Sequence, residues 1–249
     1  MNTWLEEVYA VVAKLNLYKR HLAGRSWQNA RAPQRLQRVR ELCKAGRKAF
    51  DITLDYKEKV EEVHNAMEEQ SDHWRNGVIS MLGCHITTFI DDEPVVYVLD
   101  LLSEDTLQDS IWTHNGLLRL VSFLVEKFGR VDDLVFKSDN GSHYHNSYLF
   151  SVTLPMIASM LGLKSLQWNF CEPGEGKDVC DGHFGVAGRA FRAASLSGKV
   201  MGVQGHVDVL NALNDNTSRP YTVTAEPITI DRTSTDNLLA RGAAPSSQR

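Results

Sequence analysis

The sequence of 249 residues is poor in cysteine and has no long apolar run. Its four cysteines, Cys43, Cys84, Cys171 and Cys180, are too few for a disulfide framework and fit a reducing compartment. No stretch reaches the roughly eighteen apolar residues that a membrane span requires, so no membrane partner is expected. The first residues carry acids and no basic region before their apolar stretch, so no signal peptide is expected. The sequence also shows no internal repeat, zinc finger or helix-turn-helix.

Charge is unevenly distributed although the formal net charge is only −4. Residues 19–48 hold ten lysines and arginines against one acid, whereas residues 58–72 hold six acids against one lysine. A basic block beside an acidic one indicates a polyanionic partner for the basic block, although a solvated helix face explains either run taken alone. We therefore expect DNA to bind the basic segment. The candidate contacts are Arg31, Arg35, Arg38, Arg40, Lys44, Arg47 and Lys48.

The hydrophobic pattern changes from helical to strand-like near residue 49. Helical spacing over residues 3–22, and again after Pro33, gives way to strict alternation over residues 49–56, which is typical of a strand. Two further β-rich runs, separated by a turn at 91–94, complete three antiparallel strands. Helical patterns then alternate with short strands. The helices are expected over 110–128, 147–163 and 174–197, and the strands over 134–137 and 166–170.

Three antiparallel strands followed by alternating helices and strands form the element order of the RNase H-like fold. The sequence therefore predicts an α/β domain with a mixed five-stranded sheet and a helical N-terminal extension. We divide the chain into four parts. These are a basic helical extension (1–48), an RNase H-like catalytic domain (49–197), an appendage with a helix over 206–213 and a strand over 221–230 (198–241), and a low-complexity tail expected to be disordered (242–249).

Three aspartates fall where such a sheet would bring carboxylates together. Asp55 lies near the end of the first strand, Asp139 directly follows the fourth, and Asp181 lies at the start of the last helix. In an RNase H-like sheet the first and fourth strands are neighbours. Clustered carboxylates repel one another unless a cation neutralises them, and oxygen ligands select Mg²⁺ or Mn²⁺. Two such ions about 4 Å apart can activate a nucleophile and stabilise the leaving oxygen of an in-line displacement.

Each aspartate also has a structural explanation when it is taken alone. Asp139 opens an Asp-Asn-Gly turn, Asp181 is favourable at a helix N-terminus, and Asp55 could be an exposed strand residue. All three explanations would have to hold at once, at the expected elements and in the expected order. Their joint placement therefore favours a metal site.

Two motifs around these aspartates resemble those of known proteins. The motif SDNGS at 138–142, followed by an aromatic, resembles the second-aspartate motif of retroviral integrases and DDE/DDD transposases. The run over 168–182, with its pattern Gly-Lys-x-x-Cys-Asp-Gly, resembles a block of transposon-derived eukaryotic proteins in which it supplies the third acid. Residues 54–59 look like the first-aspartate strand of those proteins, and residues 21–28 like their helical lead-in. The resemblance spans residues 17–195.

The resemblance implies a metal-dependent polynucleotidyl transferase or nuclease that cuts DNA and transfers strands with two Mg²⁺ or Mn²⁺ ions. Asp55 would bridge both ions, Asp139 would hold one and Asp181 the other. Such a protein would be nuclear, could form homo-oligomers and would need no organic cofactor. Two alternatives stay open: an RNase H-like nuclease without strand transfer, and a domesticated, inactive domain that binds DNA or protein.

The third acid departs from the integrase pattern, in which a glutamate takes this place. Aspartate is shorter by one methylene, so its helix must approach the metal more closely, and the flanking glycines such as Gly182 would permit that approach. Glu175 and Asp178 are rival third ligands, and Asp178 lies three residues before Asp181 on a similar helix face.

Other polar side chains near the aspartates are auxiliary candidates. Lys57, Lys59 and Lys177 could hold phosphates, although ordinary surface lysines give the same pattern. His183, two residues beyond Asp181, is a candidate for orienting a water or a phosphate. In the basic segment, Trp27 is the candidate aromatic for stacking on DNA.

A zinc site is the rival metal centre. Cys171, Cys180 and His183, with either Cys84 or His143, supply zinc-type ligands. Their spacing matches no standard zinc motif, and Cys180 fits equally well as a small residue buried where the last helix packs on the sheet.

Overall fold

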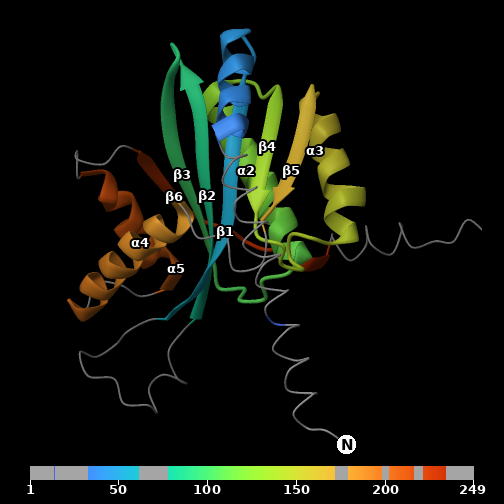
Figure 1. Ribbon diagram of the computed structural model, residues 1–249. Coiled ribbons are helices and arrows are strands. Elements are labelled where there is room, and N and C mark those ends of the chain that lie inside the picture. Colours follow the sequence, from blue (N-terminus) through green and yellow to red (C-terminus); the bar gives the residue numbers. More distant parts are fainter. Residues whose placement is uncertain are drawn as a thin grey trace, which may run out of the picture.

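The computed structural model describes residue 14 and residues 33–61, 78–171, 179–197, 202–215 and 221–233. These residues form one six-stranded sheet with helices on both faces (Figure 1). The strands are β1 (Ala49–Glu61), β2 (Val78–Ile90), β3 (Glu93–Ser103), β4 (Asp133–Ser138), β5 (Ser165–Phe170) and β6 (Thr222–Pro227). The helices are one over residues 33–44, α2 (Ser110–Phe128), α3 (Leu154–Leu161), α4 (Val179–Leu196) and α5 (Gly202–Asn211). A π-helical turn, Leu149–Thr153, precedes α3, and a short 3₁₀ turn, Ala212–Asp215, follows α5.

The strand order β5-β4-β1-β2-β3-β6 is that of an RNase H-like sheet with one strand added at its edge. β1, β2 and β3 form an antiparallel meander, while β1 pairs in parallel with β4, and β4 in parallel with β5. The predicted fold class is therefore confirmed. The predicted number of strands was wrong by one, because β6 pairs in parallel with β3 through partners such as Val98 and Val223. A short β-rich run does not reveal from sequence alone which strand it will join.

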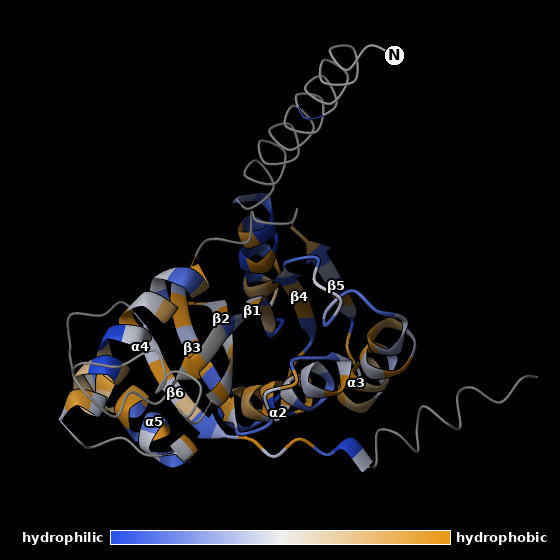
Figure 2. Ribbon diagram, turned by 90° about the horizontal axis from the view of Figure 1, so that it is seen from below, coloured by the Kyte–Doolittle hydropathy of each residue, from blue (hydrophilic) through white to orange (hydrophobic). Residues whose placement is uncertain are grey.

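One face of the sheet is covered by α2 and α3 (Figure 2). Successive side chains of a strand point to opposite faces, so Phe50, Ile52 and Leu54 of β1 all face these helices and are almost fully buried. Trp112 of α2 packs in the same apolar cluster with no exposed surface. The alternating apolar residues that predicted β1 therefore also form part of the larger core of the domain.

The opposite face is covered in two separate places. The helix over 33–44 packs on β1 and β4, where Val39 meets Val135. At the other side, α4 and α5 cover β2, β3 and β6, and Phe184 joins Met81 in a second apolar cluster. The odd-numbered residues of β1 from Ala49 to Lys57, Asp55 among them, point to this divided face. Figure 1 shows the helix over 33–44 and α4 with α5 as separate layers in front of the strands.

Residues at the ends of the helices and strands are of the types that favour helix caps and turns. Asp109 caps α2 by accepting hydrogen bonds from the backbone N–H groups of Ile111 and Trp112. Asp91 and Asp92 form the β2–β3 turn with φ of 50° and 72°, and short polar residues tolerate such angles better than bulky ones. Within the described part of the chain, every helix is too short or too polar to cross a bilayer.

Candidate active site

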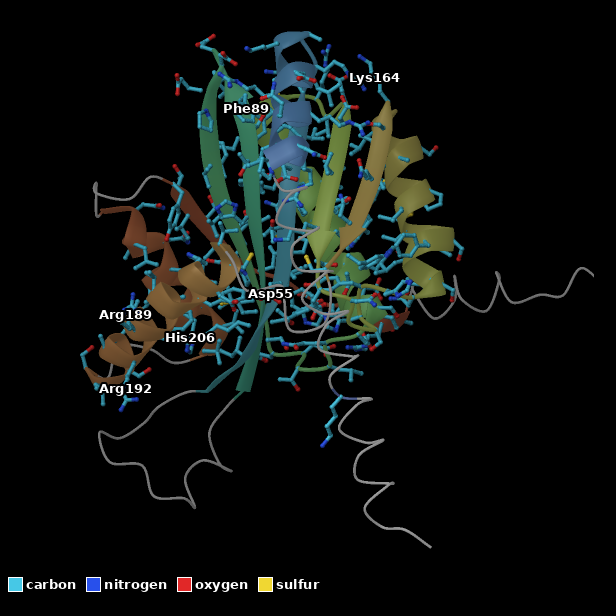
Figure 3. All side chains as sticks on the ribbon, in the orientation of Figure 1. Asp55, Phe89, Lys164, Arg189, Arg192 and His206 are labelled. Carbon is cyan, nitrogen blue, oxygen red and sulfur yellow. The ribbon has the colours of Figure 1, made fainter. Side chains whose placement is uncertain are left out.

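Asp55 and Asp139 lie at the same end of the sheet. The parallel pairing of β1 with β4 sets Thr53 opposite Lys137, so two residues further along Asp55 of β1 lies beside Asp139, which follows the end of β4. Asp55 and Asp139 line one small cavity, with Thr53, Lys137 and Cys171 also in its wall. Figure 3 marks Asp55 in the middle of β1; the prediction that it lies near the end of the strand was wrong, because β1 continues to Glu61.

Both carboxylates interact electrostatically with Tyr144, whose ring belongs to the apolar core. Burial raises the pKa of Tyr144, and the negative charges of Asp55 and Asp139 raise it further. Both aspartates therefore lie close enough to Tyr144 to act on the same hydroxyl. Among the described residues, that hydroxyl has no hydrogen-bond partner.

A tight turn orients Asp139. Its Oδ1 accepts a hydrogen bond of 2.9 Å from the backbone N–H of Gly141, and Nε2 of His143 lies 3.7 Å from the same oxygen. A Cβ on residue 141 would lie only 2.5 Å from the His143 ring, so the ring would have to move away from Asp139 to admit a larger residue. Burial lowers the pKa of His143, against the opposing effect of the Asp139 charge. The Asp-Asn-Gly sequence therefore forms a turn and also fixes the orientation of the Asp139 carboxylate, which is 39% exposed.

Asp181 lies on the first turn of α4, close to β1 but with an exposed side chain. The preceding residue, Cys180, is buried, and its Sγ lies 3.6 Å from the backbone oxygen of Thr53. This contact holds the start of α4 within two residues of Asp55 along β1. In the described ranges, however, no three histidine, cysteine or acidic side chains are close enough together to hold a metal ion. The structure thus brings two of the three predicted acids together and places the third on the neighbouring helix.

Only some of the auxiliary candidates fall among the described residues. Glu175, Lys177 and Asp178 lie outside the described residues, as does the side chain of Lys59. Lys57 lies against α4, with its Nζ 5.8 Å from the centre of the Phe184 ring.

His183 lies in a different environment from the predicted one. Its Nε2 is 2.7 Å from Oδ2 of Asp100, and the two side chains are 3% and 0% exposed. The ring therefore binds a buried carboxylate of β3 instead of facing the solvent, where it could orient a water or a phosphate. Burial raises the pKa of Asp100, while the bond to His183 opposes that shift.

Asp100 was missed in the sequence. The register pairs Asp55 with Gly83 and Gly83 with Asp100, so the two acids lie in one row across three strands. Phe184 fills the space above Gly83, since a Cβ there would lie 2.6 Å from its ring. Oδ1 of Asp100 and Nδ1 of His183 are both buried without a hydrogen-bond partner among the described residues. A single acid inside the apolar run VVYVLDLL was the available signal.

The zinc alternative finds no support among the described residues. Cys84 belongs to the core cluster on the α2 face, whereas Cys180 belongs to the cluster under α4 on the opposite face. Burial also raises the pKa of the Cys84 thiol, which disfavours the thiolate that zinc requires. Cys84 and Cys180 therefore lie on opposite faces of the sheet.

Most of the predicted DNA contacts in the basic segment bind carboxylates of the same chain. Arg35 pairs with Asp51, Arg47 with Asp133, and both Arg40 and Lys44 with Asp92. The pKa of Asp92 falls to about 2, because Arg40 and Lys44 hydrogen-bond to its charged form. Arg38 donates to the side-chain oxygen of Gln167, Lys48 is exposed, and Arg31 lies outside the described residues. A count of charges along the sequence cannot reveal these partners.

Strand order and the paired carboxylates define the chain as an RNase H-like α/β domain. The chain belongs to the family described as a domain of unknown function (DUF8701), whose profile matches residues 32–236. No curated protein matches the sequence.

Solved structures with detectable similarity include the human cytomegalovirus terminase nuclease domain. Its manganese-soaked form is 8% identical, with a TM-score of 0.33, over 85% of this chain and 86% of that one. The manganese-soaked, inhibitor-bound form is 10% identical, with a TM-score of 0.32, over 82% and 84%. These TM-scores are too low to establish a common fold, so the fold assignment rests on the strand order.

Proposed function

We propose that this chain is a Mg²⁺- or Mn²⁺-dependent nuclease that acts on DNA, with Asp55 and Asp139 as its central metal ligands. The observation that carries the proposal is that these two carboxylates, from neighbouring parallel strands, line one cavity. Hydrophobic burial does not explain two acids at one point of the sheet, and a shared cation would offset their repulsion.

The donor chemistry fits a hard divalent cation. Asp55 and Asp139 offer carboxylate oxygens, and the turn to Gly141 fixes the orientation of Asp139 before any ligand arrives. We assign Asp181 as the third ligand, because α4 holds it beside β1 and its exposed side chain can turn toward the cavity. A bound divalent ion supplies activation of the attacking oxygen and stabilisation of the leaving oxygen.

Lys137 of β4 lines the cavity itself, and the other basic residues on this side of the sheet are on α4 and β1 and not in the basic segment. Arg189 and Arg192 are exposed on α4 and project away from the sheet (Figure 3), and Lys57 lies against the same helix. We assign the main phosphate contacts to these three cations. Arg35 and Arg47 instead hold buried carboxylates in the fold, so their removal would lower stability together with any DNA affinity.

Strand transfer is the finer proposal, and it rests on the transposase-like motifs at 138–142 and 176–182. An RNase H-like nuclease that only hydrolyses DNA needs the same carboxylates. A domesticated domain without activity would not need the Asp139 carboxylate to be fixed at the cavity by the hydrogen bond from Gly141. The geometry therefore favours catalysis over binding alone.

Plasmid nicking in Mg²⁺ or Mn²⁺ tests this function. We expect nicking by the wild-type chain and its loss in Asp55→Asn and in Asp139→Asn, because the amide keeps the shape of the side chain but removes the charge that binds the metal. Asp91→Asn is the matched control, since Asp91 is an exposed turn residue with a positive φ that asparagine also accepts. Nicking that survives both site variants would refute the proposal. Joining of an oligonucleotide 3′-hydroxyl to plasmid DNA would separate strand transfer from hydrolysis.

A further inference from the structure

Four aromatic rings gather next to the carboxylate pair, on the loop after β4 and at the end of β5. The ring of His145 lies 4.7 Å from that of Phe170, and the ring of Phe150 lies 5.8 Å from Phe170 and 6.2 Å from Trp168. Trp168 and Phe170, two residues apart on β5, stack with an interplanar angle of 28°. We refer to His145, Phe150, Trp168 and Phe170 as the aromatic cluster.

Two members of this cluster, His145 and Phe150, are exposed in a way that the core aromatics are not, while Trp168 and Phe170 are partly buried against the core. His145 is exposed and Phe150 is 41% exposed, whereas Tyr144 and Trp112 have no exposed surface. Among the large apolar side chains that the described residues leave most exposed, Phe150 is the one aromatic. An exposed ring costs free energy in water, so its position on the surface calls for a reason beyond folding.

The backbone holds Phe150 outward. Phe150 belongs to the π-helical turn Leu149–Thr153, in which the neighbouring Leu149 is completely buried. Single π-helical turns occur frequently at functional sites, because the extra residue redirects side chains at little cost to the rest of the helix. Trp168 is fixed from below, since its Nε1 donates a hydrogen bond of 2.9 Å to Oγ of Ser138.

The aromatic cluster lies at the same end of the sheet as the cavity of Asp55 and Asp139, with Trp168 and Phe170 packed against the α2-face core. Phe170 pairs with Ser138 in the β4–β5 ladder, and Ser138 and the next residue after Phe170, Cys171, both line the cavity. The backbone N–H of Cys171 donates to the oxygen of Ser138, which holds the end of β5 at this point. The carboxylates and the rings therefore share one end of the sheet, and a DNA strand that crosses this end from the divided face to the α2 face passes both.

We propose that His145, Phe150 and Phe170 form a stacking surface for unpaired bases of the DNA strand beside the phosphate to be cut. This inference rests on the proposed function and specifies its substrate as DNA with single-stranded character at the cleavage point. Bases stack on aromatic side chains regardless of sequence, and their faces are accessible only where they are not already stacked in a duplex. The rings are held in place before binding, so little side-chain freedom is lost when a base stacks on them.

The test measures binding of a fluorescein-labelled single-stranded oligonucleotide, and of the matching duplex, to the full chain by fluorescence anisotropy in EDTA. We expect Phe150→Ala to weaken binding of the single strand by about five- to hundredfold, the range that loss of one stacked base produces, and to leave duplex binding within about twofold. Phe150→Trp should restore single-strand binding, because it restores a ring. Met160→Ala, which truncates another exposed apolar side chain on α3, is the control and should change neither affinity.

Three results would overturn the stacking surface: unchanged single-strand affinity in Phe150→Ala, an equal loss for single strand and duplex, or no DNA binding by the wild-type chain. Thermal melting of each variant excludes unfolding as the cause, and truncation of the exposed Phe150 should change the melting temperature little. The same variants separate this inference from the nuclease. Ring-dependent binding without metal-dependent nicking would refute the nuclease and leave the surface intact, whereas nicking with ring-independent binding would refute the surface alone.

Discussion

The two faces of the sheet are covered differently, although the same alternating strands form both. The α2 face is closed by one apolar cluster that runs from Phe50 to Ile157. The opposite face carries two separate apolar clusters, and charged side chains lie between them and at their edges. The comparison shows where chemistry is possible in this domain: stability comes from the closed face, and the divided face leaves room for carboxylates.

Carboxylates on the divided face form two groups: one pairs with arginines, and the other lines the cavity. Asp51 and Asp133, near the starts of β1 and β4, are held by Arg35 and Arg47. Further along the same two strands, Asp55 and Asp139 line the cavity. Acids at one end of the strands are thus part of the fold, and acids at the other end are placed for a ligand.

Truncation on the closed face should have the largest effect. Trp112→Ala removes a fully buried ring and the hydrogen bond of 2.9 Å from its Nε1 to the oxygen of Asp105. We expect the free energy of unfolding to fall by about 3–5 kcal/mol, as for other buried aromatics. Urea denaturation measures this, with the exposed Val125→Ala on the same helix as control. A loss no greater than that of the control would show that the α2 face does not dominate stability.

Breaking an ion pair on the divided face should cost somewhat less. Arg47→Ala leaves the carboxylate of Asp133, which has no exposed surface, without its guanidinium partner. Loss of a buried partner costs about 3–5 kcal/mol, and we expect about 2–3 kcal/mol here because Arg47 itself is partly exposed. Lys48→Ala, at the adjacent exposed position, should leave urea denaturation unchanged. Equal stability of both variants would mean that the basic segment is not tied to the fold.

The buried pair under α4 should give a smaller, pH-dependent effect. Burial raises the pKa of Asp100 above its unfolded value of about 3.9. A raised folded pKa means that the contribution of Asp100 to stability is fully present below the unfolded pKa and is lost as the pH rises through the folded pKa. Asp100→Asn keeps an oxygen for His183 but cannot ionise. Its stability relative to wild type should therefore rise with pH across that window, and a difference that stays constant in urea denaturation from pH 4 to 8 would contradict this account.

The smallest effect is expected at the exposed turn beyond the divided face. Arg40 and Lys44 lower the pKa of Asp92 to about 2. A lowered pKa contributes stability that is present above the unfolded pKa and is lost as the pH falls toward 2. Asp92→Asn should remove this part of the acid dependence of the melting temperature, and added salt should weaken it in the wild type, because exposed pairs are screened. An acid profile identical in variant and wild type would show that the turn pair contributes nothing.

The sequence predicted the fold class and the elements that carry the candidate aspartates, for identifiable reasons. Alternation in β1 determined its two faces, and the order of strands and helices then implied that β1 and β4 are neighbours. The shared end of these two strands therefore follows from the sequence pattern, and with it the closeness of Asp55 and Asp139. Asp181 was placed on the correct helix, but a helix assignment alone does not determine how far its side chain lies from a cavity.

The sequence pattern did not predict which residues far apart in the chain pair with one another. Arg47 and Asp133 are 86 residues apart, and Asp100 and His183 are 83 apart. No local pattern links such partners, so the arginines were interpreted as DNA contacts and His183 as a solvent-facing auxiliary. The strand over 221–230 was predicted, but its place in the sheet was missed for the same reason, because β6 pairs with β3 more than a hundred residues earlier in the chain. Local periodicity predicts elements, and contacts between distant elements require the structure.

Calorimetric titration with Mn²⁺ tests the central claim most directly, because it requires neither DNA nor cleavage. We expect saturable binding by the wild-type chain, with the affinity reduced by about tenfold or more, a loss of at least about 1.4 kcal/mol, in Asp55→Asn and in Asp139→Asn. The control Asp91→Asn should bind Mn²⁺ as the wild type does. Equal binding by all four proteins, or no binding by any of them, would contradict the assignment of Asp55 and Asp139 as a metal-binding pair.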